Sequence, residues 1–340
     1  MQIKDALETL LAGRDLGRND ARALIETLMT GAATPAQVGG VLIALRAKGE
    51  TVAEITGAAE AMRELATRVQ VDVPHLVDTC GTGGSGKKLF NVSTAAAFVT
   101  AAAGAHVAKH GNRGMTSASG SADVLEAAGV NLALTPEQVA RCISEVGVGF
   151  LFAQRHHAAM KHVGPARKEL GVRTIFNVLG PLTNPAGAPN QVLGVFDRVW
   201  QRPLAEVLQA LGSRHVLVVH ADSGLDEIAI DGPTHVIELQ DGTLSEYDVT
   251  PEQFGLDRAP LEALRAESPA ESLKLVQAAL AGKGPATDMV AFNAGAAIYA
   301  SGVALSLANG ITMAQDAIAA GLARERLDEL VRISSLMGED

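Results

Sequence analysis

The chain has 340 residues, of which 47% are hydrophobic, 19% charged and 3% aromatic, which is typical of a globular protein of about two domains. Its formal net charge of -10 argues against a general attraction to nucleic acid or anionic membranes, because polyanions are drawn to basic surfaces. Cys80 and Cys142 form neither a disulfide framework nor a zinc pattern, and the start MQIKDALETLLAG lacks the apolar core of a signal peptide, so we expect a cytoplasmic protein.

Helices are predicted for the N-terminal part of the chain. A capping box with proline at the first helical position begins at Thr34, and a second capping box begins at Thr51. Gly31 and Gly49 stand where the preceding helices would end. We therefore predict a small all-helical domain over residues 1–70.

Short β-rich runs alternate with alanine-rich stretches after this domain. The runs are LVDTC, HVAKHG, RHVLVVHA and HVIEL. This alternation predicts an α/β domain over residues 71–340 with a mostly parallel central sheet and crossover helices. Residues 161–189 interrupt the alternation with the helix-like GPARKELG and a proline-rich run, so we expect them to return to the helical domain. Residues 291–311 carry no charge, but their asparagines, serines and glycines favour a buried helical segment over a membrane span.

The stretch GTGGSGKK, residues 81–88, fits two phosphate-binding patterns at once. The GxGxxG pattern of dinucleotide folds needs an acid about 20 residues further on for the ribose hydroxyls. No Asp or Glu occurs between Asp78 and Asp123, so this pattern is incomplete. The P-loop pattern GxxxxGK needs a Ser or Thr after its lysine to bind magnesium, and Lys88 stands there instead. Neither pattern is favoured.

The glycine loop nevertheless keeps the general features of a phosphate site, because glycines let backbone N–H groups approach an anion. The acid-free window that contains it holds a basic island in an acidic protein, made of Lys87, Lys88, Lys109, His110 and Arg113. A flexible surface turn with solvated lysines is the alternative for the loop by itself. The runs NVST, KHGNRGMTS and SGS add hydroxyls, amides and cations at further turns between strands and helices. Together they predict one large ligand of polyphosphate and sugar at the carboxyl edge of the sheet.

An ordered set of motifs carries a family resemblance. The motifs GTGG, NVST, KHGNRG, SGSADVLEAAG, HHAAMKHVGPARKELGVRTIFNVLGPLTNPAG and GLDE, in this order, closely resemble the anthranilate phosphoribosyltransferases. The N-terminal TPAQVGGVLIALRAKGET is similar to the same family, so the resemblance covers nearly the whole chain.

The resemblance implies a small helical domain hinged to a larger α/β domain of the nucleoside phosphorylase/phosphoribosyltransferase-like kind, paired as a homodimer through the helical domain. The implied reaction joins the amine of anthranilate to C1 of phosphoribosyl pyrophosphate and releases pyrophosphate, in tryptophan biosynthesis. Mg²⁺ is the implied cofactor. No nucleic acid and no membrane is expected as a partner.

The resemblance also implies roles for individual residues, although it names no certain catalytic acid or base. Electrostatic and positioning roles are implied for Lys109, His110 and Arg167. Contacts with phosphoribosyl pyrophosphate are implied for Gly81, Gly84, Ser85, Leu89, Asn91, Val92, Ser93, Thr94, Lys109, His110, Gly111, Asn112, Arg113, Gly114, Met115, Thr116, Ser117 and Ser121. Contacts with anthranilate are implied for Gly81, His110, Asn112, His157 and Arg167. Magnesium ligands are implied at Ser93, Asp226 and Glu227, since hard oxygen donors suit this ion.

Two residues, one in the glycine loop and one directly after it, depart from the family pattern. Ser85 stands where the family commonly has Asp, and Leu89 stands where a hydroxyl is common, which puts a second metal site in doubt. Lys87 and Lys88 are expected to supply part of the positive charge that such a metal would bring. Arg113, Lys161 and Arg173 are expected to give electrostatic or structural support as well.

Two other functions stay open at this point. A pyrimidine nucleoside phosphorylase shares the implied fold and binds phosphate and a nucleoside, but it would lack Arg167 in the GPARKELG context and the KHGNR turn. A catalytically silent homologue that binds nucleic acid should have a basic face and eroded motifs. This chain is acidic and its motifs are largely intact, so transfer of the phosphoribosyl group is favoured.

Overall fold

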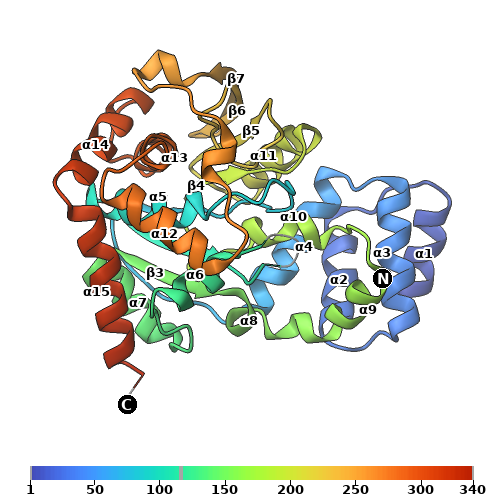
Figure 1. The fold of residues 1–340 in the computed structure, drawn as a ribbon. Helices are drawn as coiled ribbons and strands as arrows, with labels where there is room; N and C mark the ends of the chain where they lie inside the picture. The colour runs from blue at the N-terminus through green and yellow to red at the C-terminus, as the bar shows by residue number, and fades with distance from the viewer. Residues whose placement is uncertain (1, 115–117, 339–340) are drawn as a thin grey trace.

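The structure is a computed structural model that describes residues 2–114 and 118–338. A bundle of helices that includes the N-terminus lies beside a larger part built on a central sheet (Figure 1). The α-helices are α1 (Ile3–Leu11), α2 (Arg18–Met29), α3 (Pro35–Lys48), α4 (Val52–Leu65), α5 (Val92–Ala102), α6 (Ser121–Ala127), α7 (Pro136–Val146), α8 (Ala153–His156), α9 (Gly164–Leu170), α10 (Phe176–Leu179), α11 (Gln201–Ala210), α12 (Pro269–Leu280), α13 (Ala286–Ala300), α14 (Leu307–Ala319) and α15 (Leu322–Leu336). The strands are β1 (Leu76–Asp78), β2 (His106–Gly111), β3 (Val148–Phe152), β4 (Asn190–Gly194), β5 (His215–Ala221), β6 (Thr234–Gln240) and β7 (Thr243–Val249). Short 3-10 helices are η1 (Ala158–His162), η2 (Gly180–Leu182), η3 (Arg198–Trp200), η4 (Pro251–Phe254) and η5 (Leu261–Leu264).

The N-terminal bundle begins and ends its helices at the predicted signals. The Thr34 hydroxyl accepts a hydrogen bond from the Gln37 N–H at 3.3 Å, and the Gln37 side chain accepts one from the Thr34 N–H at 2.9 Å. A second box joins Thr51 to Glu54 in the same way. Helix α3 ends at Gly49, which has a φ of 91°, a value that glycine adopts without strain. The two capping boxes and the stop at Gly49 are therefore confirmed.

Part of the chain between β3 and β4 lies against this bundle. Helix η1 contacts α2, α9 contacts α3 and α10 contacts α4. Arg63 of α4 donates a hydrogen bond from Nε to the carbonyl oxygen of Leu182 at 2.7 Å. The chain thus leaves the sheet after β3, packs on the helices and comes back to the sheet at β4.

The central sheet has the strand order β3-β2-β1-β4-β5-β6-β7. Strands β1 to β5 pair in parallel, whereas β6 is antiparallel to both β5 and β7. The mostly parallel sheet and the fold class are confirmed, but the HVIEL run, in β6, is antiparallel to its neighbours. Strands β3, β4 and β7 are not among the predicted β-rich runs. Strand β7 lacks an apolar run because it is a largely exposed strand at the edge of the sheet.

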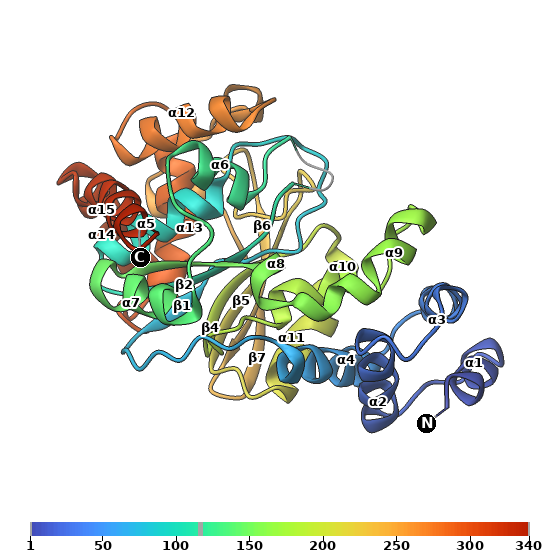
Figure 2. The same cartoon turned by 90° about the horizontal axis from the view of Figure 1, so that it is seen from below.

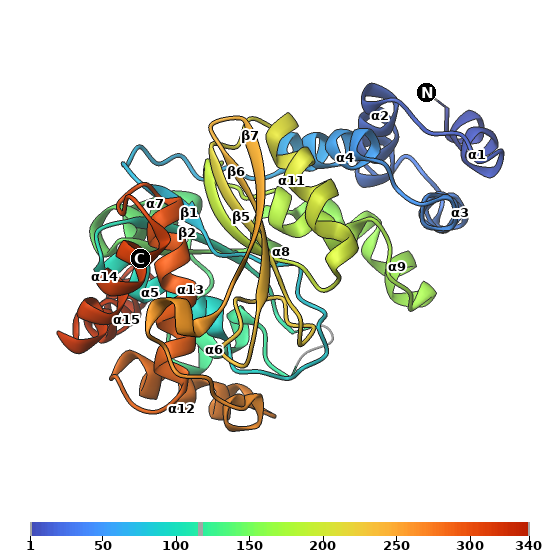
Figure 3. The same cartoon turned by 90° about the horizontal axis from the view of Figure 1, so that it is seen from above.

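Both faces of the sheet are covered, which explains the continuous apolar runs of its strands. Leu217 and Val219 of β5 belong to the core cluster that contains α5, α13 and α15, whereas Val216 and Val218 belong to a second cluster with α11 and the bundle helices. Figures 2 and 3 show α5, α13 and α15 on one face of the sheet and α11 on the other. Because side chains alternate along a strand, one strand joins both cores.

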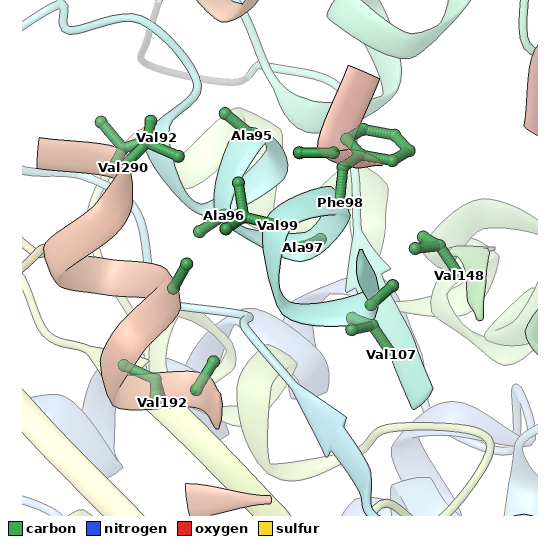
Figure 4. Packing of buried hydrophobic residues seen from close by; sticks show 14 of the residues in the cluster. Val92, Ala95, Ala96, Ala97, Phe98, Val99, Val107, Val148, Val192 and Val290 are labelled. Atoms are coloured by element: carbon green, nitrogen blue, oxygen red, sulfur yellow. The ribbon is translucent and has the colours of Figure 1, made fainter. Parts of the chain in front are cut away.

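Helix α5 lies in the centre of the core cluster that it shares with α13 and α15, and it follows the glycine loop in the chain. Its sequence VSTAAAFVTAA is buried at nearly every position, and its alanines let α13 approach closely. Figure 4 shows Val92 pointing toward Val290 of α13, and Phe98 and Val107 lying on the side toward Val148. The helix begins at Val92, four residues after the end of the glycine loop at Lys88.

The uncharged segment 291–311 is buried in its first part, within α13, as predicted, but Leu305 in the following turn is 93% exposed and the segment forms parts of two helices. A turn after Ala300 separates α13 from α14. The two helices lie in close contact at glycines, because a Cβ on Gly310 would come within 2.2 Å of the Gly295 carbonyl oxygen. Among residues 2–114 and 118–338, no helix has the length and apolarity needed to span a membrane.

Candidate active site

The sheet topology places several loops at one point. Strand β1 has β2 on one side and β4 on the other, so the connections after β1 and β4 run to opposite sides. In open α/β sheets, ligands bind at such a switch point, beyond the carboxyl ends of the strands. A cavity of about 490 Å³ lies at this edge. The predicted site residues that line it are Gly81, Gly84, Ser85, Leu89, Asn91, Ser93, Lys109, His110, Gly111, Asn112, Arg113, Gly114, Ser121, His157, Arg167, Asp226 and Glu227.

Some residues predicted to contact phosphoribosyl pyrophosphate do not line the cavity. Val92 is 1% exposed and belongs to the core on α5, and its N–H is bonded to the Phe90 carbonyl oxygen at 2.8 Å. Thr94 is also 1% exposed, with a buried hydroxyl that has no partner among the described residues. Met115, Thr116 and Ser117 lie outside the described residues.

The glycine loop depends on glycine at several positions. Gly83, Gly84 and Gly86 have φ values of 64°, 87° and 71°, which other residues adopt only with strain. Gly81 has another reason, because a Cβ there would come within 2.9 Å of the carbonyl oxygen of Gly194. The loop can therefore approach the end of β4 this closely only because Gly81 has no side chain.

The two lysines of the loop have different surroundings. Lys88 pairs with Glu267, with 2.8 Å between Nζ and the carboxylate oxygen. Lys87 has no ion-pair partner within the described parts of the chain, and its side chain lies next to Gly224. Of the two charges expected to compensate for Ser85, one is therefore already neutralised locally.

A partly buried cation in the cavity has no anionic partner. Arg167 lies in α9, which begins at a Gly-Pro pair and ends at Gly171 in the left-handed conformation. Its guanidinium carbon lies 5.1 Å from the ring centroid of Phe176. Burial lowers the pKa of Arg167, and no carboxylate of residues 2–114 or 118–338 forms an ion pair with it. A charge desolvated without a partner is costly, so this arrangement suits an anionic ligand.

Two buried histidines line the same cavity. The ring centroids of His110 and His157 are 5.1 Å apart. The Nδ1 of His110 lies 3.1 Å from the Gly180 carbonyl oxygen, to which it donates, so its Nε2 is an unprotonated acceptor without a partner among the described residues. Burial, together with the neighbouring histidines, lowers the pKa of His110 well below its usual value and that of His157 to about 4. Both rings are therefore neutral at pH 7.

The buried neutral state of His157 predicts a pH-dependent stability. Below pH 6.5 the unfolded chain gains a proton at this residue, while the folded protein stays neutral there down to about pH 4, so the free energy of unfolding falls as the pH falls between these values. His157→Asn removes the titration and should make this loss smaller by about 3 kcal/mol. Urea unfolding at pH 7, 5.5 and 4.5 measures it, with His162→Asn at an exposed histidine as control. Equal slopes for wild type and His157→Asn would contradict the expectation.

The predicted magnesium ligands Ser93, Asp226 and Glu227 all line the cavity, and Ser93 is hydrogen-bonded to Glu227. A Cβ on Gly194 would come within 1.7 Å of the Asp226 carbonyl oxygen, so the glycine at the end of β4 lets the Asp226 loop approach. Burial and the nearby Asp226 raise the pKa of Glu227 to about 8, while hydrogen bonds from Ser93 act in the opposite direction. The Ser93 hydroxyl also lies 3.4 Å from Nζ of Lys109. Two carboxyl groups and a hydroxyl are hard oxygen donors of the kind that Mg²⁺ binds, and a bound cation would favour the ionised form of Glu227.

Another group, Asp78, Cys80 and His110, also brings together side chains of metal-binding types. Both oxygens of Asp78 are already in use, since they accept the His110 N–H at 3.1 Å and the Asn184 side-chain N–H at 2.7 Å. Burial raises the pKa of Cys80, which keeps its thiol protonated. A hydrogen-bonded cluster explains this group better than a metal site does.

Arg113 lines the cavity, but acids of α6 hold its guanidinium. It pairs with Asp123 at 3.1 Å and with Glu126 at 2.6 Å. Asp123 also accepts the N–H groups of Gly114 and Gly120, at 2.8 and 2.9 Å. Arg113 thus fixes the turn after β2, and a contact with a phosphate stays a prediction.

Two phenylalanines that line the cavity are not among the predicted site residues. Phe176 and Phe196 supply aromatic faces for Arg167 and Arg173. The two phenylalanines have no sequence signal of their own, because a lone aromatic residue after a strand or in a helix usually belongs to a core. Arg173, expected only to give support, lines the cavity and donates a hydrogen bond to the Gly84 carbonyl oxygen.

Two family models match the chain in the order of its parts. Residues 4–66 match the model described as Glycosyl transferase family, helical bundle domain, and residues 73–324 match the model described as Glycosyl transferase family, a/b domain. The fold and the cavity at the sheet edge thus define a glycosyltransferase with a helical bundle and an α/β part.

Individual relatives define the family more closely. The anthranilate phosphoribosyltransferase of Methylococcus capsulatus is 59% identical over 335 residues, which cover 98% of each chain. The crystal structure of anthranilate phosphoribosyltransferase from Thermus thermophilus matches with a TM-score of 0.92 and 47% identity, covering 97% of this chain and 99% of that one. The enzyme from Saccharomyces cerevisiae in complex with PRPP and Mg matches with a TM-score of 0.88 and 28% identity, covering 98% of both. The chain belongs to the anthranilate phosphoribosyltransferase family.

Proposed function

We propose that this chain transfers the phosphoribosyl group of phosphoribosyl pyrophosphate to the amine of anthranilate, giving N-(5-phosphoribosyl)anthranilate and pyrophosphate, in tryptophan biosynthesis. One observation carries the proposal. A single cavity joins a glycine loop and the buried Lys109 to two neutral histidines and to Arg167, which has no ion-pair partner among the residues that the structure describes. The first set suits a polyphosphate, and the second suits an aromatic carboxylate with an uncharged amine.

The carboxylate of anthranilate binds Arg167, because a planar guanidinium matches a carboxylate in two parallel hydrogen bonds. The amine is a weak nucleophile and must be held in line with C1 of the ribose. His110 and His157 are uncharged, and Nε2 of His110, which has no partner in the described part of the chain, can accept a hydrogen bond from the amine. Neutral rings also leave the charge of Arg167 available to the substrate.

Departure of pyrophosphate leaves positive charge on the ribose and negative charge on the leaving group, so the protein mainly supplies electrostatic stabilisation. Lys109 is 3% exposed, and its Nζ donates to the Thr79 carbonyl oxygen at 3.2 Å. This ammonium and the backbone N–H groups of the glycine loop are the groups that neutralise the leaving group. Asp226, Glu227 and Ser93 would hold Mg²⁺, which when bound neutralises further phosphate charge. The S. cerevisiae relative, in complex with PRPP and Mg, supports this cofactor.

The fluorescence of anthranilate tests the function directly. It should fall with time only when the protein, phosphoribosyl pyrophosphate and Mg²⁺ are all present, because the substituted amine is a different fluorophore. Leaving out each component in turn is the control. No loss of fluorescence, together with phosphate-dependent cleavage of a pyrimidine nucleoside, would instead identify a nucleoside phosphorylase.

We also propose that the chain works as a homodimer in the cytoplasm. Leu11 of α1 and Ile43 of α3 are large apolar side chains exposed by 74% and 39% on neighbouring helices of the bundle, which supports pairing through this part. Cys80 and Cys142 are free thiols, which suits a reducing compartment.

A further inference from the structure

Neighbouring segments hold both ends of the glycine loop. At its start, the Thr82 N–H donates to the Gly194 carbonyl oxygen at 2.8 Å. At its end, the Lys88 carbonyl oxygen accepts the Ala266 N–H at 3.0 Å. These two hydrogen bonds fix the ends of the loop to β4 and to the segment before α12. They do not restrain residues 83–87, which lie between them.

Arg173 holds the middle of the loop. Its Nη2 donates to the Gly84 carbonyl oxygen at 2.8 Å. Its guanidinium carbon lies 3.9 Å from the ring centroid of Phe196, so the flat group is stacked on an aromatic face. A stacked guanidinium loses little freedom on bonding, since its position is already set.

The same residue is tied to the helical bundle. Arg46 of α3 donates a hydrogen bond from its guanidinium to the carbonyl oxygen of Arg173. Arg173 follows α9, and α9 packs against α3. A continuous line of contacts therefore runs from α3 through Arg46 and Arg173 to Gly84 in the cavity.

The contact matters because of the conformational freedom of the loop. Gly83, Gly84 and Gly86 all have positive φ, and glycine loses more backbone freedom on ordering than any other residue. In a trans peptide the C=O and the following N–H point in opposite directions, so a bond to the Gly84 carbonyl also fixes the direction of the Ser85 N–H. A loop that is ordered before the ligand arrives binds it with a smaller entropic cost.

We infer that Arg173 is a positioning residue that holds the glycine loop in its phosphate-binding form, and that Arg46 makes this hold depend on the helical bundle. The inference rests on the proposed function for the identity of the phosphate ligand. Arg173 also lines the cavity, so a direct contact with the ligand is the competing explanation. Arg46 does not line the cavity and cannot touch the ligand directly, so a variant of Arg46 distinguishes positioning of the loop from direct contact with the ligand.

The experiment compares Arg173→Ala, Arg173→Lys and Arg46→Ala with Arg22→Ala. Arg22 is the control because it forms an exposed ion pair with Glu64 within the bundle. Trypsin cleavage after Lys87 and Lys88, both exposed, reports the freedom of the loop without any substrate, and mass spectrometry identifies the cut. Steady-state kinetics give the KM for phosphoribosyl pyrophosphate and for anthranilate separately.

Arg173→Ala should speed this cleavage severalfold and raise the KM for phosphoribosyl pyrophosphate about tenfold, as expected for loss of a hydrogen bond from a charged group. Arg46→Ala should also raise the cleavage rate and the KM for phosphoribosyl pyrophosphate, but by less. Arg173→Lys should not restore the wild-type cleavage rate or KM, since lysine lacks the planar guanidinium that stacks on Phe196. The KM for anthranilate, and the Arg22→Ala variant, should stay at wild-type values. Inorganic pyrophosphate with Mg²⁺ should protect the wild-type loop from trypsin.

A raised KM in Arg173→Ala with wild-type cleavage, or wild-type behaviour of Arg46→Ala in both measurements, would overturn the inference in favour of direct contact. The cleavage rates are measured without turnover. A failure of the proposed reaction would therefore leave them valid, and the two failures can be told apart.

Discussion

Replacing Arg167 by alanine should weaken productive binding of anthranilate by about 2–5 kcal/mol, the usual cost of breaking a buried charged pair, which corresponds to a rise in KM of roughly 30-fold to several thousandfold. The guanidinium is partly desolvated beside Phe176 and has no ion-pair partner within residues 2–114 and 118–338, so its charge is available to a carboxylate. The KM for phosphoribosyl pyrophosphate should change little, because the glycine loop and Lys109 are intact in this variant.

Two further variants sharpen this test. Arg167→Lys keeps the charge but loses the two parallel hydrogen bonds, so its KM for anthranilate should lie between those of wild type and Arg167→Ala. Lys168→Ala removes an exposed charge one residue further along α9 and should behave as wild type. An unchanged KM and kcat with anthranilate in Arg167→Ala would remove this residue from the acceptor site.

Replacing Asp226 by Asn and Glu227 by Gln together should keep the fold but lower turnover at low Mg²⁺ by roughly a hundredfold or more, since loss even of an outer partner of a metal ligand costs about 10–100-fold in metal affinity. The amides have the size of the acids they replace, and the amide oxygen introduced by Glu227→Gln can still accept a hydrogen bond from Ser93. High Mg²⁺ should recover part of the activity by mass action.

A Mg²⁺ titration of kcat/KM measures the effect. Asp222→Asn is the control, because Asp222 is an exposed acid four residues before Asp226 that does not line the cavity. Its titration curve should match that of wild type. Wild-type kinetics of the double variant at every Mg²⁺ concentration would refute the assignment of Asp226 and Glu227 as ligands.

The family motifs of the sequence locate the candidate site well where function needs a particular residue type. The glycines of the loop and Arg167 all line the cavity. Their types are recognisable in a sequence because a positive φ or a close backbone contact requires glycine, and a planar cation requires arginine. Val92 shows the limit of motif reasoning. It lies within the NVST motif, but the first turn of α5 points its side chain into the core.

Local chemistry is readable from the sequence because its causes lie within a few residues. The capping boxes at Thr34 and Thr51, the stop at Gly49 and the apolar runs of β2 and β5 each depend on neighbours along the chain, so the helical bundle and the parallel sheet follow from them. The net charge of -10 with a local basic island likewise places an anion site in an otherwise acidic protein without coordinates.

Long-range contacts depend on packing between segments far apart in the chain, and no local pattern encodes them. Lys88 meets Glu267 across 179 positions, Arg46 meets Arg173 across 127, and only the folded chain shows that the first pair neutralises a loop charge while the second ties the bundle to the cavity. The pKa of Glu227, raised to about 8, has the same origin, since burial comes from the surrounding tertiary structure. Residue types along the chain thus define what chemistry is present, and folding decides which charges stay free to perform it.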